Sequence, residues 1–392
     1  MASRPPSPHP PAQAVRPRLL TPALALLFVA TFGAMTSFQL LIPVVPLYAE
    51  ATGAGEFGAG ATTAALLATT VAAELVTPWL TARAGPRLVF AAGLVLLGAP
   101  VLALPAAHHL AAILAVCLVR GLGFGIVVVL ASALVAELVP PQRRGEGLGL
   151  HGISVGLPGV VALPFGVYLV DLVGYPPVFL VGAVAALAGL AAVPGLPGRR
   201  HRSRQPGQTG GGLWSALRTP ALVRPALVFA AAATASGIVL TFLPLAAPGE
   251  GGTLAAAALL GYAVTSTGFR WWAGRYGDRH GPGRLILPSV LVAAVGMLLL
   301  GWVSNPVVLL VAMPLFGIGF GISQNASLAL MFNRSPVQGY GGASALWNIA
   351  YDGAMGVGAM GFGAVVGLTG YPLGFLLTGG LILLALPLAR RA

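Results

Sequence analysis

Long apolar runs follow one another along almost the whole chain, separated by short breaks that contain glycine, proline or charged residues. About 20 apolar residues are enough for a helix to cross the hydrocarbon core of a membrane. The pattern predicts twelve spans, at about 21–47, 59–81, 87–105, 110–138, 145–170, 177–195, 222–246, 253–272, 284–303, 306–331, 339–367 and 372–389. The first run continues into IPVVPLY instead of a small-residue cleavage site, so we interpret it as a span and not as a signal peptide.

The charged residues fall in alternate breaks. All 21 basic residues are arginine, and 20 of them lie in the N-terminal tail, in every second break or at the C-terminus. The breaks in between carry acidic residues instead: Glu50, Glu56, Asp171 and Glu250. Because arginine-rich loops stay in the cytoplasm, this distribution predicts a multi-pass membrane protein with both termini cytoplasmic. In this interpretation Arg270 belongs to the end of the eighth span and its cytoplasmic loop.

The composition excludes several classes of protein. Of the 392 residues 57% are hydrophobic and only 8% are charged, whereas a soluble domain has about 25% charged residues. A soluble enzyme, a nucleic-acid-binding domain and a disordered chain are therefore excluded, and the arginine-rich loops explain the net charge of +12 without a nucleic acid partner. One cysteine rules out a disulfide scaffold, and the histidines show no ligand spacing. We expect no metal, no cofactor and no enzymatic activity.

The chain divides into two halves around one polar stretch. Residues 196–219, which are rich in arginine, glycine and proline, predict a cytoplasmic linker between six-helix bundles at 19–195 and 220–392. Residues 1–18 predict a disordered cytoplasmic tail. The linker of about 24 residues is too short to hold a signalling domain, which argues against a membrane sensor that does not transport.

A shift of 196 residues superimposes one half on the other. It places GLGFGI at 121–126 on GIGFGI at 317–322, and GYPPVF at 174–179 on GYPLGF at 370–375. Two parallel six-span repeats are one common plan of secondary transporters. The sequence therefore predicts an all-α membrane protein of twelve transmembrane helices arranged as two pseudo-repeats.

Two loop motifs resemble those of the major facilitator superfamily, which carries G-x-x-x-D-R-x-G-x-R/K after span 2 and often again after span 8. The second copy retains Gly274, Asp278, Arg279 and Gly281. The first copy retains Arg83, Gly85 and Arg87, with Pro78 and Ala82 in place of the leading glycine and the aspartate. The chain resembles in particular the bacterial drug and metabolite efflux permeases of this family. The resemblance implies the family fold, a cytoplasmic gating role for these residues, transport by alternating access, and a monomer.

Three charged residues lie inside predicted spans, where each costs about 2.5–3.5 kcal/mol on insertion scales. They are Arg120 in span 4, Glu74 in span 2 and Asp352 in span 11. The other half does not share them: the shift places Phe316, Arg270 and Gly156 at the matching positions. Charges that break the symmetry of the repeat favour a function in proton coupling over a purely structural one.

Each of these charges leaves an alternative open. Arg120 binds an anionic substrate group or tunes a nearby acid, or else it caps helix carbonyls. Asp352 carries a proton, or else it is hydrogen-bonded to Asn348 or to a neighbouring helix end. By the family resemblance spans 2 and 11 face each other, so Glu74 would approach Asp352; otherwise Glu74 pairs with an arginine. His151 aligns with Trp347 and is more simply structural.

By the same resemblance, spans 1, 4, 7 and 10 line the transport cavity. The candidate substrate-binding residues are the polar and aromatic side chains there and one on span 11: Phe38, Gln39, Thr234, Ser236, Phe320, Gln324, Asn325 and Asn348. Because these spans are mostly apolar, the first hypothesis is proton-coupled export of a small lipophilic compound such as a drug or secondary metabolite. The alternative is a proton-coupled uptake permease for a small nutrient, with an anionic group bound by Arg120.

The expected partners are a small-molecule substrate, protons and the lipid bilayer. No phosphate-binding loop for ATP is present in the sequence. Heavy use of alanine, glycine, proline and arginine without lysine suggests a bacterium, and hence its inner membrane.

Overall fold

The computed structural model describes residues 20–139, 144–198, 212–247, 252–336 and 339–390. The predicted tail at 1–18 and the middle of the predicted linker, 199–211, lie outside these residues. Within the described ranges the regular structure is helical and contains no strand. The predicted all-α class is therefore confirmed.

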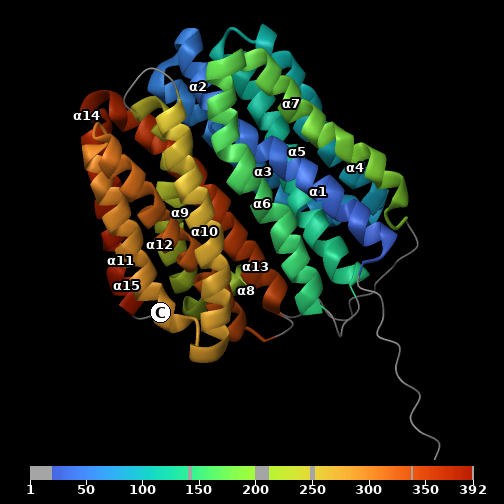
Figure 1. Ribbon diagram of the computed structural model, residues 1–392. Helices are drawn as coiled ribbons and strands as arrows, with labels where there is room; N and C mark the ends of the chain where they lie inside the picture. The colour runs from blue at the N-terminus through green and yellow to red at the C-terminus, as the bar shows by residue number, and fades with distance from the viewer. Residues whose placement is uncertain (1–19, 140–143, 199–211, 248–251, 337–338, 391–392) are drawn as a thin grey trace, which may run out of the picture.

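The helices form two sets that lie side by side (Figure 1). The first set contains α1 (Pro22–Leu41), α2 (Val44–Ala49), η1 (Glu50–Ala54), α3 (Gly55–Ala84), α4 (Pro86–Gly98), η2 (Ala99–Ala106), α5 (Leu110–Leu138), α6 (Arg144–Val173), α7 (Tyr175–Ala188) and η4 (Gly189–Gly195). The second set contains α8 (Leu213–Leu217), α9 (Pro220–Ala246), α10 (Thr253–His280), α11 (Gly283–Leu299), η5 (Leu300–Trp302), α12 (Pro306–Asn333), α13 (Tyr340–Asn348), η7 (Ile349–Gly353), α14 (Ala354–Leu384) and α15 (Leu386–Arg390). We call the end of the molecule that carries α2 the α2 end, and the opposite end the α8 end.

Each predicted span coincides with helix. Nine stretches of the described residues are long and apolar enough to cross a membrane. Two of them, Pro22–Ala84 with 63 residues and Tyr340–Arg390 with 51, have the length of two crossings each. The second is broken at Gly370, whose φ of +72° favours glycine. The remaining predicted span, the eighth, is the 28-residue α10, which carries several arginines.

The repeat seen in the sequence is also present in the backbone. Gly85 and Gly281, which are 196 residues apart, have φ of +85° and +86° in the turns after α3 and α10. Gly174 and Gly370 are separated by the same interval and have φ of +77° and +72°. A side chain other than glycine would be strained at all four positions, so the same turn geometry ends corresponding helices in both sets.

Helix packing repeats at the same interval. The Thr69 hydroxyl of α3 donates a hydrogen bond to the Leu118 carbonyl of α5 at 2.8 Å. At the matching positions, the Thr265 hydroxyl of α10 donates to the Pro314 carbonyl of α12 at 2.9 Å. Corresponding helix pairs thus pack in the same way, and differences between the sets must come from individual side chains.

The two sets make close contact towards the α2 end. The hydroxyl oxygens of Thr63 on α3 and Thr241 on α9 lie 2.9 Å apart. A Cβ atom added to Gly60 would overlap the carbonyl oxygen of Ala359 on α14, so only a glycine allows α3 and α14 to approach this closely. The sets also meet where α6 contacts α10: the backbone N–H of Gly252, just before α10, donates a hydrogen bond to the Asp171 carboxylate of α6.

Candidate functional site

Two carboxyl groups from different helix sets meet where α3 contacts η7. Glu74 lies on α3 and Asp352 on η7, and their side chains are 9% and 7% exposed. The two carboxyls are in electrostatic contact, and the buried oxygens of Glu74 have no hydrogen-bond partner among the described residues. The structure thus brings together the two acids that the resemblance predicted would approach each other.

The local backbone explains how the two acids reach each other. η7 is a single π-helical turn between α13 and α14, and such a turn re-aims the side chains that it carries. One turn further along, Gly356 faces α3, where an added Cβ would lie 3.3 Å from the Cβ of Leu67. The small residue lets α14 and α3 approach closely next to the acidic pair.

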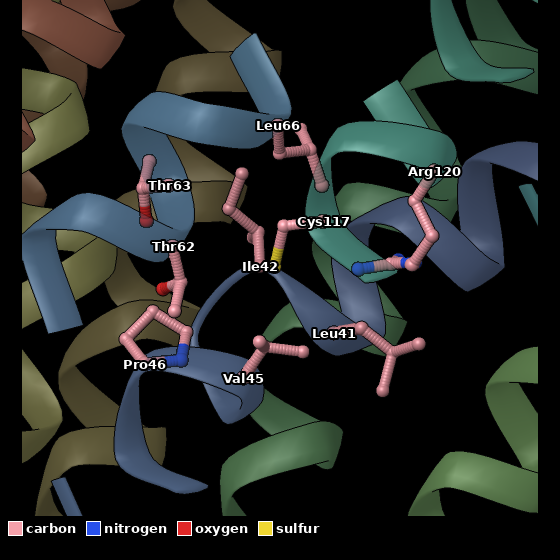
Figure 2. Close-up of a pocket in the computed structure, with 9 residues that line it drawn as sticks. All are labelled: Leu41, Ile42, Val45, Pro46, Thr62, Thr63, Leu66, Cys117 and Arg120. Carbon is pink, nitrogen blue, oxygen red and sulfur yellow. The ribbon is translucent and has the colours of Figure 1, made fainter. Parts of the chain in front are cut away.

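Arg120 lies apart from this pair, inside the first set of helices. Its guanidinium is directed into a small cavity (Figure 2). The cavity is lined by Leu41, Ile42, Val45, Pro46, Thr62, Thr63, Leu66, Cys117 and Arg120. Its volume of about 10 Å³ holds about one water molecule. The electrostatic neighbour of Arg120 is Cys117, so the structure does not support the prediction that Arg120 acts together with the acids.

The guanidinium of Arg120 is 1% exposed, and none of its three nitrogens donates a hydrogen bond to any group in the described part of the chain. The alternative that it caps helix carbonyls is therefore not supported either. A buried charge without partners is costly in a membrane protein.

We therefore expect Arg120→Met to raise the thermal stability of the protein. The substitution removes a buried charge and fills similar volume with an apolar side chain. The measurement is thermal unfolding of the purified full chain in detergent, compared with Arg120→Lys, which keeps the charge. A lower unfolding temperature for Arg120→Met would mean that the guanidinium has partners that stabilise the fold.

Arg270 is a site residue that the sequence analysis missed. The prediction placed it at the end of span 8 and in its loop, but α10 continues to His280, so Arg270 lies well inside the helix. Its side chain is half-buried and donates a 3.4 Å hydrogen bond to Gln324 of α12. It is also in electrostatic contact with Tyr262 and Tyr351. The 196-residue shift, which places Arg270 on Glu74, was the signal that it could face the interior.

Several predicted substrate-binding residues lie in the second set near Arg270. Gln324 accepts its hydrogen bond, and the ring of Phe320 lies 6.1 Å from that of Tyr351. The hydroxyls of Ser236 and Tyr262 lie 2.8 Å apart. These residues from α9, α10, α12 and η7 surround one region of the interior.

The other predicted substrate-binding residues are more dispersed. Phe38 stacks on Phe124 with centroids 3.7 Å apart. The Gln39 amide nitrogen would lie 3.3 Å from a Cβ added to Gly159. The remaining three are half-buried: Thr234, which donates to Ala230 at 2.9 Å, Asn325, which faces Gly274, and Asn348. Asn348 makes no hydrogen bond to Asp352 in the described structure, against the alternative raised for that acid.

The predicted gating residues lie at the α8 end, where α3 and α10 finish. In the first copy the Arg83 guanidinium lies 4.0 Å from the Trp79 ring centroid, and Arg87 donates to the Leu196 carbonyl. Gly85 turns the chain into α4. The contact of Arg83 with Trp79 lies within α3, and the hydrogen bond of Arg87 joins the start of α4 to the residue after η4.

In the second copy, Asp278 and Arg279 are exposed at the end of α10, and Gly281 provides the left-handed turn into α11. Gly274 packs against Asn325 of α12, where an added Cβ would lie 3.4 Å from the amide nitrogen. No three histidine, cysteine, aspartate or glutamate side chains gather as a metal site would require, within the ranges that the structure describes.

Solved structures similar to this chain share its fold. A nucleoside transporter, NupG, matches with 13% identity over 94% of this chain and 98% of its own, at a TM-score of 0.74. The xylose transporter XylE from E. coli, in a partially occluded inward-open conformation, matches with 15% identity over 95% and 98%, at 0.74. A POT family transporter in complex with a thioalcohol-conjugated peptide matches with 13% identity over 94% of both chains, at 0.77. At these identities the likeness concerns the fold alone.

The sequence itself gives the family. No curated protein sequence gives a significant match. The family described as Major Facilitator Superfamily matches at residues 27–359 and 252–391, which together cover nearly the whole chain. With this match and the fold in agreement, the chain belongs to the Major Facilitator Superfamily and is a membrane transporter, not an enzyme.

Proposed function

We propose that this transporter couples the movement of a small organic compound to that of protons, and that the carboxyl pair of Glu74 and Asp352 is its proton site. The observation that carries the proposal is the contact of two buried acids, one from each helix set. The two acids occur at one interface and not at its pseudo-symmetric counterpart, which supports a function specific to this pair.

Electrostatics link the proton to the conformation. Two ionised carboxylates about 4 Å apart repel by about 4 kcal/mol at an effective dielectric constant of 20. The closed contact between α3 and η7 therefore favours a pair that shares one proton. When the two helix sets move apart at this level, each carboxyl meets water alone and the pair can lose its proton. Protonation thus favours one conformation of the transporter over the other.

The surroundings support a solute with an apolar body. Aromatic side chains from both sets lie in the interior, including the stacked pair of Phe38 and Phe124 and the cluster of Phe229, Phe320 and Tyr351. One proton moving through 100 mV and one pH unit supplies about 3.7 kcal/mol, enough for a gradient of several hundredfold. Export of a lipophilic compound, favoured by the sequence, stays a prediction, as do the cytoplasmic termini and the bacterial inner membrane.

The proposal predicts that Asp352→Asn and Glu74→Gln each abolish proton coupling. Inside-out vesicles with an acidic lumen are given a panel of lipophilic compounds, and collapse of the pH gradient is followed. Wild type should show compound-dependent collapse, and each variant should lower its rate at least tenfold, because an amide cannot release a proton into water. Accumulation of labelled compound in the lumen during the collapse would establish export.

Two controls separate loss of coupling from loss of folding. Glu137→Gln removes an exposed carboxyl on α5, outside the site, and should behave as wild type. Exchange of labelled compound across the membrane at equal pH should persist in Asp352→Asn. If both carboxyl variants collapse the gradient at the wild-type rate, the pair is not the proton site.

A further inference from the structure

Two pseudo-symmetric interfaces join the helix sets, and their central residues differ. The 196-residue shift relates Glu74 on α3 to Arg270 on α10, and Asp352 on η7 to Gly156 on α6. At the first interface a carboxyl meets a carboxyl. At the second, a guanidinium meets a glycine: a Cβ added to Gly156 would lie 3.1 Å from the Nη2 of Arg270. Where the first interface has an acid, the second has no side chain.

Arg270 has no anionic partner in the described structure. Its hydrogen-bond acceptor is the neutral amide of Gln324 at 3.4 Å, which is a weak bond. Its electrostatic contacts are with Tyr262, Tyr351 and His151. An intramembrane cation without a counter-ion is costly, so its presence favours a function in binding. The side chain is also half-buried and is not fully enclosed by the protein.

Other groups around Arg270 suit the same ligand. His151 of α6 is in electrostatic contact with Arg270, and its buried Nδ1 has no hydrogen-bond partner among the residues described. The half-buried ring of Tyr351 packs on Phe229 and Trp347, with centroids 5.4 Å and 5.6 Å away. A cation and an unpartnered ring nitrogen thus lie beside an aromatic surface.

We propose that the carboxylate of an organic monoanion binds beside Gly156, where it pairs with Arg270 while its apolar or aromatic body lies against Tyr351. The inference rests on the proposed function, since it names the substrate class of that transporter. A guanidinium binds a carboxylate through two parallel hydrogen bonds, which gives both orientation and affinity. The carboxylate of the solute would take the position that corresponds to Asp352 of the first interface, where the second interface has Gly156. Arg270, and not Arg120 as the sequence suggested, is the group that recognises the anion.

The test measures binding and not transport. Purified full-length protein in detergent is dialysed to equilibrium against benzoate, 2-naphthoate and octanoate, each compared with its neutral amide. Wild type should bind at least one carboxylate at least tenfold more tightly than the amide, since charge-assisted hydrogen bonds are about twice as strong as neutral ones. Arg270→Gln should abolish this preference. No carboxylate preference in wild type, or an unchanged preference in Arg270→Gln, overturns the inference.

A change at Gly156 tests the geometry independently of Arg270. Gly156→Asp places a carboxylate beside the guanidinium and should remove the carboxylate preference by competing for it. Gly156→Asn is the matched control, because it fills the same volume without the charge. A carboxylate preference that is retained in Gly156→Asp would contradict the inference, because the introduced carboxylate occupies the position proposed for the solute.

The outcome is distinguishable from failure of the proposed function. Asp352→Asn should lose proton coupling and keep the carboxylate preference, because the Asp352 carboxyl interacts with Glu74 and not with Arg270. If the carboxyl variants keep both the carboxylate preference and normal proton coupling, the proposed proton site is wrong and the anion site is unaffected. Intact coupling through the acids with no effect of Arg270→Gln contradicts the anion site alone.

Discussion

Joining Thr63→Cys to Thr241→Cys by a disulfide should stop transport completely, and a reductant should restore it. The two hydroxyl oxygens lie 2.9 Å apart and belong to α3 and α9, one from each helix set. Cysteine sulfurs at these positions need only a small further approach to reach the bond length of about 2.05 Å. The disulfide would hold the α2 end closed, and alternating access requires that each end opens in turn.

The experiment is well defined in this chain because it has a single cysteine. Cys117 is buried and is replaced by alanine in the background protein. Transport by the double variant is measured in vesicles before oxidation, after oxidation and after reduction, with each single cysteine variant treated in the same way. The single variants should be insensitive to oxidation. Full transport by the oxidised, cross-linked protein would show that the α2 end does not open during the cycle.

The sequence predicted the architecture well because its signals are local. Apolar runs of sufficient length fix the spans, and the equal spacing of glycines such as Gly85 and Gly281 fixes the repeat. The structure confirms both features, because helix formation in a membrane depends on the run itself. Which helices face each other is not a local property. The contact of Glu74 with Asp352 could be predicted only through the family resemblance, which supplied the arrangement of spans 2 and 11.

The two misplaced arginines show where local reasoning fails. Arg270 was placed at the end of span 8, where its loop begins, because the apolar pattern of that span ends near residue 272, yet α10 continues to His280. The C-terminal part of α10 is polar, and neighbouring helices cover some of it: Arg270 contacts Gln324 and Gly156. This part of the helix therefore does not need an apolar surface. Arg120 was grouped with the acids because it lies near the middle of its span. The neighbours of a side chain depend on the direction in which it faces, and Arg120 faces Cys117 and not the acids.

The pseudo-symmetry relates the positions of these charged residues in the two halves. The backbone and the packing hydrogen bonds of Thr69 and Thr265 are repeated, so both interfaces begin from one geometry. The interface of α3 with η7 has two acids, whereas the interface of α10 with α6 has a single arginine opposite a glycine. In the two proposals the proton and the anion bind at pseudo-symmetric positions of the two interfaces. Export of a monoanion in exchange for one proton would move two charges inward, so 100 mV would supply about 4.6 kcal/mol, whereas joint uptake would be electroneutral.

Asp352→Lys should abolish transport in a protein that still folds. The substitution converts the contact of two acids into an ion pair between Glu74 and the introduced ammonium group. An ion pair between the two helix sets favours the closed contact of α3 with η7 and removes the proton that the carboxyl pair would share. The expected result is no compound-dependent collapse of the pH gradient, together with a normal elution profile in size-exclusion chromatography.

Adding Glu74→Gln to Asp352→Lys tests whether the side chains at positions 74 and 352 are in contact. Alone, Glu74→Gln removes one acid of the pair and should cost little stability. Combined with Asp352→Lys it leaves a buried ammonium without a counter-ion, which costs about 3–5 kcal/mol when a buried pair is broken. The double variant should therefore unfold at a clearly lower temperature than either single variant, and the non-additive part measures the interaction of positions 74 and 352. Additive effects on the unfolding temperature would mean that the two side chains do not meet, and the proton site would then have to lie elsewhere.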